Sequence, residues 1–460
     1  MIADMTIRFD NSYLRDLPGT CLRAVPAIAP APRLLAFNTD LALALGLDLS
    51  EGEAAAWFSG AEVPPGAEPV ALAYAGHQFG GFSPQLGDGR AHLLGEFLGP
   101  DGRRWDLQLK GSGRTAFSRG GDGKAAVGPM LREYLMSEAM AALGVPTTRS
   151  LAVVATGEEV WREGGALPGA VLARIAASHI RVGTFEFFSA RGETDKLRAL
   201  MDYTMSRHYP GVAGALEFFD AVTARQARLV AGWMGLGFIH GVMNTDNMAL
   251  SGETIDYGPC AFLDAYAPGT VFSSIDRQGR YAYANQPLIM GWNLARLAEA
   301  LLPFLDDDPA RAVDLANGRL EGIAGIYRRE WLGVMRRKLG LVGDSPGDEA
   351  LIDDLLPAMV GLDWTLTLRR GFPGLGPWRD RWLARVGEGW QLRLMAVNPA
   401  VIPRNHVVEQ VLDAATAGDM APFRALLSAL RDPYGQEAGR EAYVLPPPEG
   451  LAPHVTYCGT

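Results

Sequence analysis

Two short stretches in the second half of the chain decide its fold: HGVMNTDN at residues 240–247 and DYG at residues 256–258. Both lie in a glycine-containing segment, residues 240–285, whose composition predicts loops. Asn247 and Asp256 offer the hard oxygen ligands that Mg²⁺ prefers. Together they predict a magnesium site of the kind that bridges the phosphates of a nucleotide.

The order of these residues matches the catalytic and metal-binding loops of protein kinases. Against the pattern H-R-D-L-x-x-x-N, His240 and Asn247 take the outer positions, and the DYG triplet replaces D-F-G. The catalytic aspartate of a kinase is replaced by Val242, which accepts no proton. Asp246 is the nearest carboxylate that could orient a nucleophile. The alternative is that Asp246 only stabilises its loop.

The sequence before these loops supplies parts of a nucleotide-binding lobe. QLGDGR places Gly87 and Gly89 in the turn of a predicted strand pair, where backbone amides can approach phosphate oxygens, although two glycines in a hairpin are often only a turn. Lys110 ends the strand-like run WDLQLK, and Glu133 lies on the next helix. A kinase lysine is held by a helix glutamate in this way, whereas a solvated glutamate is the alternative.

Two further groups are candidates for contact with an anion. Asp122 and Gly123 lie in a glycine-rich loop just before the helix, whose N-terminal amides favour anions. Arg174 and Arg181 flank the sequence AASH, and paired guanidinium groups can clamp a terminal phosphate. The alternative is that both arginines are ordinary surface charges.

The periodicity of the chain predicts an α+β fold, a protein-kinase-like bilobal fold with a β-rich N-lobe and an α-rich C-lobe. Strand-like runs precede and follow a helix expected at about residues 125–143, and the chain turns helical after Ser189. An earlier stretch, residues 34–47, is also expected to be helical. We predict an N-terminal extension (1–70), an N-lobe (71–188), a helical C-lobe (189–445) and a C-terminal tail (446–460).

Composition excludes several classes of function. A net charge of −10 disfavours general attraction to nucleic acid or to an anionic membrane surface. The first residues do not read as a secretory signal and no apolar run is long enough to span a membrane, so we expect a cytoplasmic protein. Cys21, Cys260 and Cys458 are too few for a disulfide framework.

Longer strings in the chain resemble the selenoprotein O family. They are GHQFGGFSPQLGDGR from Gly76, LKGSGRTAFSRGGDGKA from Leu109, HGVMNTDN, DYGPCAFLD and NPAVIPRNH from Asn398. The resemblance covers nearly the whole chain. It implies a kinase-like fold that binds ATP in a reversed orientation and transfers AMP to Ser, Thr or Tyr hydroxyls of proteins.

The resemblance also implies roles for individual residues. It makes Asp246 the proton acceptor and Glu133 the support of the lysine, with Mg²⁺ (or Mn²⁺) as the metal and ATP, with UTP also open, as the substrate. The implied metal ligands are Asn247 and Asp256. The implied nucleotide contacts are Gly87, Gly89, Arg90, Lys110, Asp122, Gly123, Arg174, Arg181 and Asp256.

The family often ends in a selenocysteine or cysteine, and here Cys458 lies near the C-terminus. We expect either a redox-switched disulfide between Cys260 and Cys458 or two free thiols. Two other functions stay open from sequence: a phosphotransferase, and a non-catalytic pseudokinase that binds nucleotide and partners.

Overall fold

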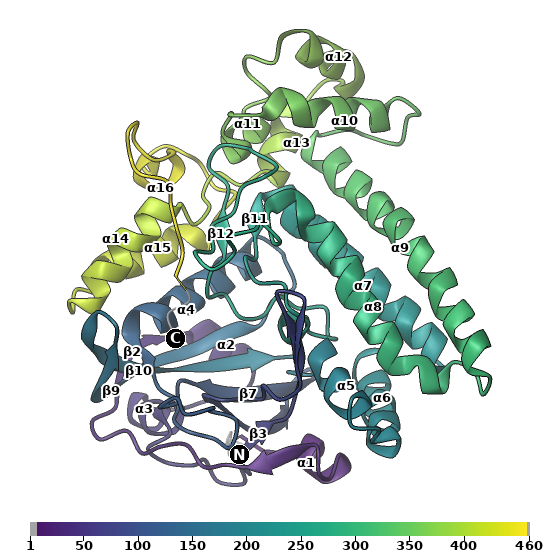
Figure 1. Ribbon diagram of the computed structural model, residues 1–460. Helices are drawn as coiled ribbons and strands as arrows, with labels where there is room; N and C mark the ends of the chain where they lie inside the picture. The colour runs from purple at the N-terminus through teal and green to yellow at the C-terminus, as the bar shows by residue number, and fades with distance from the viewer. Residues whose placement is uncertain (1–6, 458–460) are drawn as a thin grey trace.

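The first half of the chain builds one antiparallel sheet in the computed structural model, which describes residues 7–457. The strand order is β1-β3-β6-β7-β10-β9-β2, and β8 pairs with β10 (Figure 1). The strands are β1 (Cys21–Arg23), β2 (Arg33–Phe37), β3 (Val70–Leu72), β6 (Ala91–Leu98), β7 (Arg104–Lys110), β8 (Ala125–Ala126), β9 (Arg149–Arg162) and β10 (Gly165–Ala176).

Alternation along β7 and β10 gives the two faces of the sheet different tasks. Leu107 and Leu109 point into a core with Val171. Their neighbours Gln108 and Lys110 point to the other face, where the register places them opposite Arg174 and Leu172 of β10. Because directly opposite residues have neighbouring side chains, this register brings Lys110 and Arg174 to one face.

Helices cover the two faces of the sheet. The helix α4 (Val127–Ala142) packs against β9 and β10 on the Lys110 face, while α2 (Thr39–Ala44) and α3 (Glu51–Ser59) cover the Leu109 face. Figure 1 shows α4 and α3 on opposite sides of the strands. The short helix α1 (Ser12–Asp16) packs against β6.

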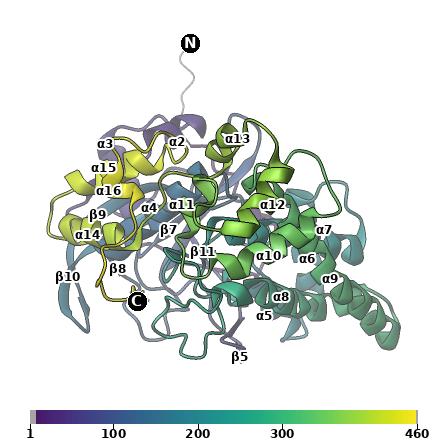
Figure 2. The same ribbon diagram turned by 90° about the horizontal axis from the view of Figure 1, so that it is seen from above.

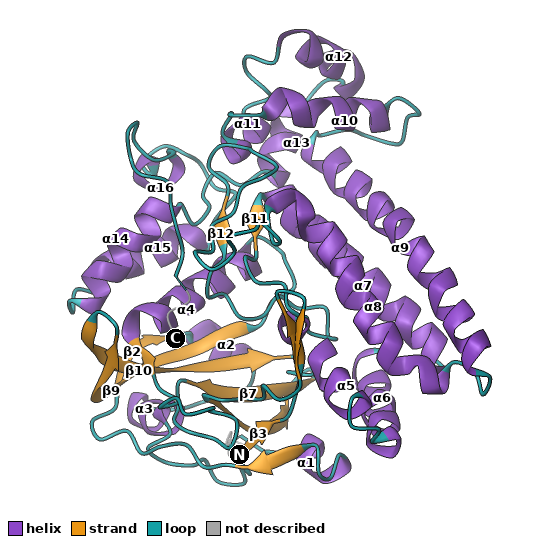
Figure 3. Ribbon diagram, viewed as in Figure 1, coloured by secondary structure: helices purple, strands orange, loops and turns teal. Residues whose placement is uncertain are grey.

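From Val182 onward the regular secondary structure is almost entirely helical, apart from two short strands (Figure 3). The helices α7, α8 and α9 lie side by side, and loops with the short strands β11 and β12 connect them to the sheet. The elements are α5 (Val182–Ser189), α6 (Thr194–His208), α7 (Gly214–Leu236), β11 (Phe238–Ile239), β12 (Ala261–Phe262), α8 (Gln286–Leu301), α9 (Pro309–Lys338), α10 (Asp348–Met359), α11 (Trp364–Arg369), α12 (Gly376–Val386), α13 (Trp390–Val397), α14 (Asn405–Thr416), α15 (Ala421–Leu430) and α16 (Glu441–Val444).

The last helices return to the first half of the chain. Both α14 and α15 pack on α4, and Figure 2 shows them beside the edge of the sheet that carries β9. Arg132 of α4 forms an ion pair with Glu409 of α14 at 2.8 Å, and Tyr134 contacts the ring of Phe423. The helix that carries Glu133 is therefore held from both sides.

Several expectations from sequence are confirmed, and two are wrong. The helix at residues 125–143 is α4, and the strand ending at Lys110 is β7. Residues 34–47 are not one helix, because Leu34–Phe37 continue β2 and only Thr39–Ala44 form α2. Nor is QLGDGR the turn of a strand pair, since β5 and β6 do not pair with each other.

The described residues form a mixed fold of one large antiparallel sheet, two small two-stranded sheets and many helices, as the α+β prediction requires. The lobes and the boundaries after residues 70, 188 and 445 stay predictions. Within residues 7–457, no helix combines the length and apolar composition needed to cross a bilayer.

Candidate active site

A buried cluster of opposite charges lies where β7, β10 and α4 meet the loop that carries Asp256. The Nζ of Lys110 donates to Glu133 Oε2 at 2.6 Å and to Asp256 Oδ1 at 2.5 Å. Arg174 Nη1 donates to the same two carboxylates, at 3.0 Å to Glu133 and 2.7 Å to Asp256. Its Nη2 donates to Gln108 Oε1 at 2.6 Å, which fixes the guanidinium plane. The structure thus joins four residues that lie far apart in the sequence.

Arg181 connects this cluster to the catalytic-loop candidate. Its Nη1 donates to the backbone oxygen of Asp246 at 2.9 Å and lies 3.6 Å from Asp256 Oδ2. The guanidinium also stacks on the ring of Tyr74, 4.3 Å from the centroid, and is almost fully buried. Asp246 and Asp256 are therefore close to one shared nitrogen.

The charges of the cluster leave a place for an anion. Burial alone would raise the pKa of Asp256, but Lys110, Arg174 and Arg181 hold that pKa well below its ordinary value. Burial would lower the pKa of Arg174, whereas Asp256 and Glu133 raise it. Lys110, Arg174 and Arg181 thus gather around Asp256, and the first two also contact Glu133. Three neighbouring cations suit the phosphates of a nucleotide.

The loops that carry Asn247 and Asp256 are anchored by His240. Its Nε2 lies 2.9 Å from the backbone oxygen of Ile255, and its Nδ1 lies 3.4 Å from the Val242 amide. Burial lowers the pKa of His240, so the neutral ring donates from Nε2 and accepts at Nδ1. The backbone of Asp256 has a positive φ of 63°, a strained conformation for a residue with a side chain.

Asn247 ends a short 3₁₀ helix, Thr245–Asn247, and its amide is already oriented. The Nδ2 donates to the backbone oxygen of Val242 at 3.0 Å, which leaves the side-chain oxygen of Asn247 available as a ligand. Val242 itself is buried and contributes only its backbone here. Val242, which replaces the catalytic aspartate of a kinase, thus orients the side chain of Asn247 through its backbone oxygen.

Asp246 is the carboxylate best placed to receive a proton near this cluster. Its side chain is buried, with 8% of the residue exposed, and burial raises its pKa to about 6. Gln78 Nε2 lies 3.5 Å from Oδ2, while Oδ1 has no hydrogen-bond partner among the described residues. A carboxylate in this state lacks a donor, and a substrate hydroxyl can supply one.

A two-stranded hairpin, β4 (Gly76–Gln78) and β5 (Gly81–Ser83), covers Asp246. The His77 amide donates to Thr245 Oγ1 at 2.8 Å, and His77 Nδ1 lies 2.5 Å from Glu186 Oε1. The Thr245 hydroxyl donates to the other Glu186 oxygen. Sequence reasoning missed His77 and Glu186, although His77 lies in the conspicuous string GHQFGGFS.

The two glycine-rich loops pack against each other beside Lys110. Gly87 has a φ of 67°, and a Cβ there would clash with the ring of Phe117. Ser118 Oγ donates to the Gly89 oxygen at 2.5 Å, which ties the loops together. The backbone oxygen of Arg90 accepts from the Gly111 amide at 2.7 Å, next to Lys110. The structure therefore places Arg90 beside the end of the Lys110 strand, with Gly87 and Gly89 in the loop just before it.

Comparison with known proteins identifies the family. The model for "Protein adenylyltransferase SelO" matches residues 6–365. The chain belongs to the SelO family. Relatives called protein nucleotidyltransferase YdiU are 58% identical in Cereibacter sphaeroides, covering 99% of this chain and 100% of the relative, and 53% identical in Rhizobium leguminosarum bv. trifolii, covering 98% and 97%. A third, from Chromobacterium violaceum, is 55% identical and covers 95% and 98%. By this membership the chain is a nucleotidyltransferase.

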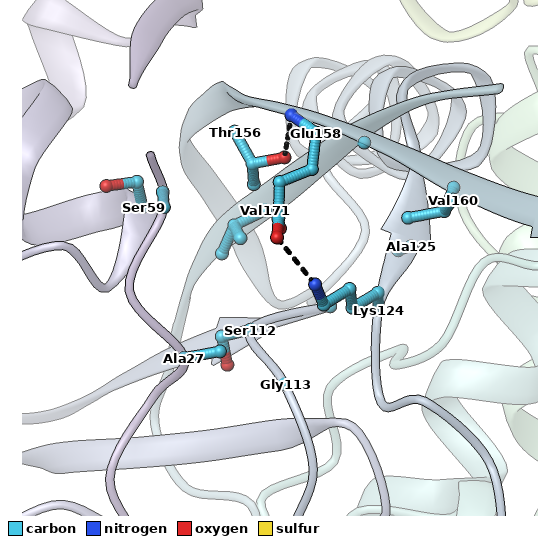
Figure 4. Close-up of a pocket in the computed structure, with 13 residues that line it drawn as sticks. Ala27, Ser59, Ser112, Gly113, Lys124, Ala125, Thr156, Glu158, Val160 and Val171 are labelled. Carbon is cyan, nitrogen blue, oxygen red and sulfur yellow. Dashed lines mark hydrogen bonds and ion pairs between the residues drawn. The ribbon is translucent and has the colours of Figure 1, made fainter. Parts of the chain in front are cut away.

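Within this SelO-family chain, Asp122 lies apart from the Lys110 cluster in its contacts. Its carboxylate pairs with Arg162 at 2.8 Å and accepts from the Lys124 amide at 2.9 Å. Lys124 in turn pairs with Glu158 at the rim of a small hollow (Figure 4). That hollow is lined by Val171, so it lies on the sheet face opposite Lys110. Gly123 packs against the backbone of Gly113, where a Cβ would clash.

The predicted cysteine pair cannot be described as a pair, because Cys458 lies outside the described residues. Cys260 is a free thiol in the core, and burial raises its pKa to about 12. The chain just before Cys458 does approach this region, since Thr456 Oγ1 donates to the Pro259 oxygen at 2.8 Å. The disulfide stays a prediction.

Proposed function

We propose that this chain transfers AMP from ATP to Ser, Thr or Tyr hydroxyls of other proteins and releases pyrophosphate. The observation that carries the proposal is the group of three cations, Lys110, Arg174 and Arg181, around Asp256 and beside the buried Asp246. The cations suit the phosphates of ATP, and the carboxylate suits a hydroxyl. The sheet with α4 and the helical region correspond, in this proposal, to the N-lobe and C-lobe of a kinase-like fold.

The residues around Asp256 fit a divalent metal ion. Asn247 offers one free oxygen and Asp256 a charged carboxylate, and both are hard ligands. We assign the metal to these residues, with Mg²⁺ preferred and Mn²⁺ as an alternative. When bound, the ion would neutralise phosphate charge and orient the triphosphate.

The chemistry of the chain's own residues is mainly positioning and electrostatics. The acceptor oxygen attacks the α-phosphorus, the bond from the α-phosphorus to the bridging oxygen breaks, and pyrophosphate leaves. Asp246 receives the proton of the attacking hydroxyl at its carboxylate. Lys110 and Arg174 stabilise charge on the phosphates, with Glu133 holding both in place. In the reversed ATP pose, Arg174 and Arg181 contact the terminal phosphate.

The other predicted nucleotide contacts belong to the two glycine-rich loops. Arg90 directly precedes the residue of β6 that pairs with Lys110, and this supports the proposal that the Gly87–Gly89 loop before it contacts the nucleotide. For Asp122 and Gly123 we propose contact with the nucleotide at its far end, because their loop packs on the Gly89 loop.

Parallel incubation with α-labelled and γ-labelled ATP tests this function. Adenylyl transfer places only the α-label on an acceptor protein. Phosphoryl transfer would place only the γ-label, and a pseudokinase scaffold would place neither, so each of these results contradicts the proposal. The same assay with labelled UTP, and with Mn²⁺ in place of Mg²⁺, defines the nucleotide and the metal.

A further inference from the structure

The tip of the β4–β5 hairpin carries an aromatic residue in a strained conformation. Phe79 has a φ of 52°, a region that phenylalanine rarely adopts and that glycine or asparagine adopts readily. Its amide is held by Asn244 Oδ1 at 3.1 Å and by the Tyr281 hydroxyl at 3.2 Å. Its ring meets the ring of the buried Tyr281 edge-on at 5.1 Å between centroids, yet 38% of Phe79 is exposed, so the residue still offers surface to a partner. A turn alone does not require phenylalanine here, and this points to a use for the ring.

A second exposed ring and an arginine extend the same surface. Phe82 is 43% exposed and its ring lies 4.9 Å from that of His77. The guanidinium of Arg280 lies beside Gly80 and over the ring of Trp292, at 4.7 Å from the centroid. Among residues 7–457, no ion pair with a carboxylate is found for Arg280. We call Phe79, Phe82 and Arg280 the hairpin face.

The hairpin face adjoins the proposed proton acceptor. Gln78, which precedes Phe79, reaches to 3.5 Å from the Asp246 carboxylate. Asn244, which holds the Phe79 amide, lies two residues before Asp246 and accepts from Tyr281 at 2.5 Å. The phosphate-side cation Arg181 instead contacts the backbone of Asp246. The carboxylate of Asp246 thus faces the hairpin, whereas its backbone oxygen faces Arg181.

We propose that the hairpin face binds the segment of the acceptor protein that flanks the target hydroxyl. An apolar side chain of that segment packs on Phe79 and Phe82, and an acidic side chain pairs with Arg280. Aromatic residues and arginine are the side chains that most often dominate such contacts. The proposal rests on the proposed function, which supplies the need for an acceptor at Asp246.

Charge supports an acidic partner at this position. The chain has a net charge of −10, so an acidic protein is repelled by its surface in general. Arg280, which has no carboxylate partner among the described residues, supplies a local positive charge beside Asp246. Arg280 would therefore select acceptor proteins by the residues that flank the target hydroxyl rather than by their net charge.

Three synthetic peptides test the inference. Each peptide has Ser, Thr or Tyr at its centre, the same residue in all three. The first is flanked by Leu and Asp. The second has Ala in place of Leu, and the third has Lys in place of Asp. Transfer of α-label from ATP gives kcat/KM for each peptide, and the KM for ATP is measured alongside. We expect the wild-type chain to favour the first peptide by about tenfold, the effect of one good contact.

The variants separate a binding role from a structural one. Phe82→Ala should remove the preference for Leu over Ala, and Arg280→Glu should invert the preference between Asp and Lys. Both should leave the KM for ATP within about twofold of wild type, since neither touches the phosphate cations. Trp161→Ala, which removes another exposed ring, 73% exposed on β9, is the matched control and should change nothing.

Every other result overturns the inference. Equal labelling of the peptides by the wild-type chain, label on whole proteins but on none of the peptides, or an unchanged charge preference in Arg280→Glu would each do so. If Phe82→Ala instead changes the oligomeric state, the hairpin face is a contact between copies of the chain. If neither peptides nor proteins take α-label, the proposed function fails together with this inference. If proteins take α-label but the peptide preferences are absent, only this inference fails.

Discussion

The choice between lysine and arginine is informative at the residue scale. Of 42 basic residues in the chain, only Lys110, Lys124, Lys196 and Lys338 are lysine. Lys110 contacts Glu133 and Asp256 from one nitrogen, and Arg174 does the same through Nη1, so this contact pattern alone does not require a lysine. Lys338 differs, because burial lowers its pKa to about 7. Arginine stays charged at any ordinary pH and would not tolerate that site.

The buried Lys338 predicts a dependence of stability on pH. Its pKa is lower in the folded state, so between about pH 7 and 10 the unfolded chain binds more protons and stability rises with pH. One such group adds a slope of up to about 1.4 kcal/mol per pH unit. Lys338→Met should remove that slope in denaturant titrations, whereas the exposed Lys196→Met should keep it. Equal slopes in wild type and Lys338→Met would contradict the lowered pKa.

Asp246 predicts a separation of catalysis from nucleotide binding. Asp246→Asn keeps the shape of the side chain but removes the proton acceptor, and such losses typically cost about 10²- to 10⁴-fold in rate. The Kd for ATP should change little, because Arg181 donates to the backbone oxygen of Asp246, which Asp246→Asn retains. Turnover and equilibrium nucleotide binding measure the two effects. A variant with wild-type turnover would remove Asp246 from the mechanism.

At the scale of elements, helices and strands that follow from short sequence windows could be predicted, whereas contacts between distant segments could not. The period of α4 and the alternation of β7 are properties of short windows, so Glu133 and Lys110 were found from sequence. The hairpin β4–β5 has only three residues in each strand and two adjacent glycines, which is too little pattern to predict that it covers Asp246. His77 and Glu186 lie 109 residues apart, and only the fold brings them together.

The hairpin predicts an effect of Gly76→Ala on turnover. A Cβ at Gly76 would lie 2.5 Å from Asp246 Oδ1 and 2.9 Å from a Leu86 methyl group, so the hairpin or the carboxylate has to move. We expect a loss of transfer of about 10²-fold, as small misplacements of a reacting group can cost. Gly52→Ala in α3, where a Cβ meets nothing within 4 Å, is the control. Full activity in Gly76→Ala, at unchanged thermal stability, would show that the hairpin can move away from Asp246 without loss of transfer.

At the scale of the whole molecule, segments from both ends of the chain complete the structure around the site. Residues 21–23 and 33–37 add outer strands to the sheet, and α14 and α15 pack on α4 from near the other end. Arg132 of α4 also donates to the Cys260 oxygen at 2.7 Å, so the same helix is tied to the loop after Asp256. Periodicity predicted that α14 would be a helix but carried no information about what it packs on.

This arrangement predicts how the whole molecule responds to nucleotide. Three neighbouring buried cations suit a polyanion, and a ligand that binds only the folded chain stabilises it by mass action, so ATP with Mg²⁺ should add about 2.7 kcal/mol at 100 times its Kd. Thermal unfolding would show the rise in Tm, and a chelator should reverse most of it. Asp256→Ala should lose the part that depends on metal but keep a smaller rise with ATP alone, because Lys110, Arg174 and Arg181 remain. An equal rise in wild type and Asp256→Ala would mean that Asp256 holds no metal in the nucleotide complex.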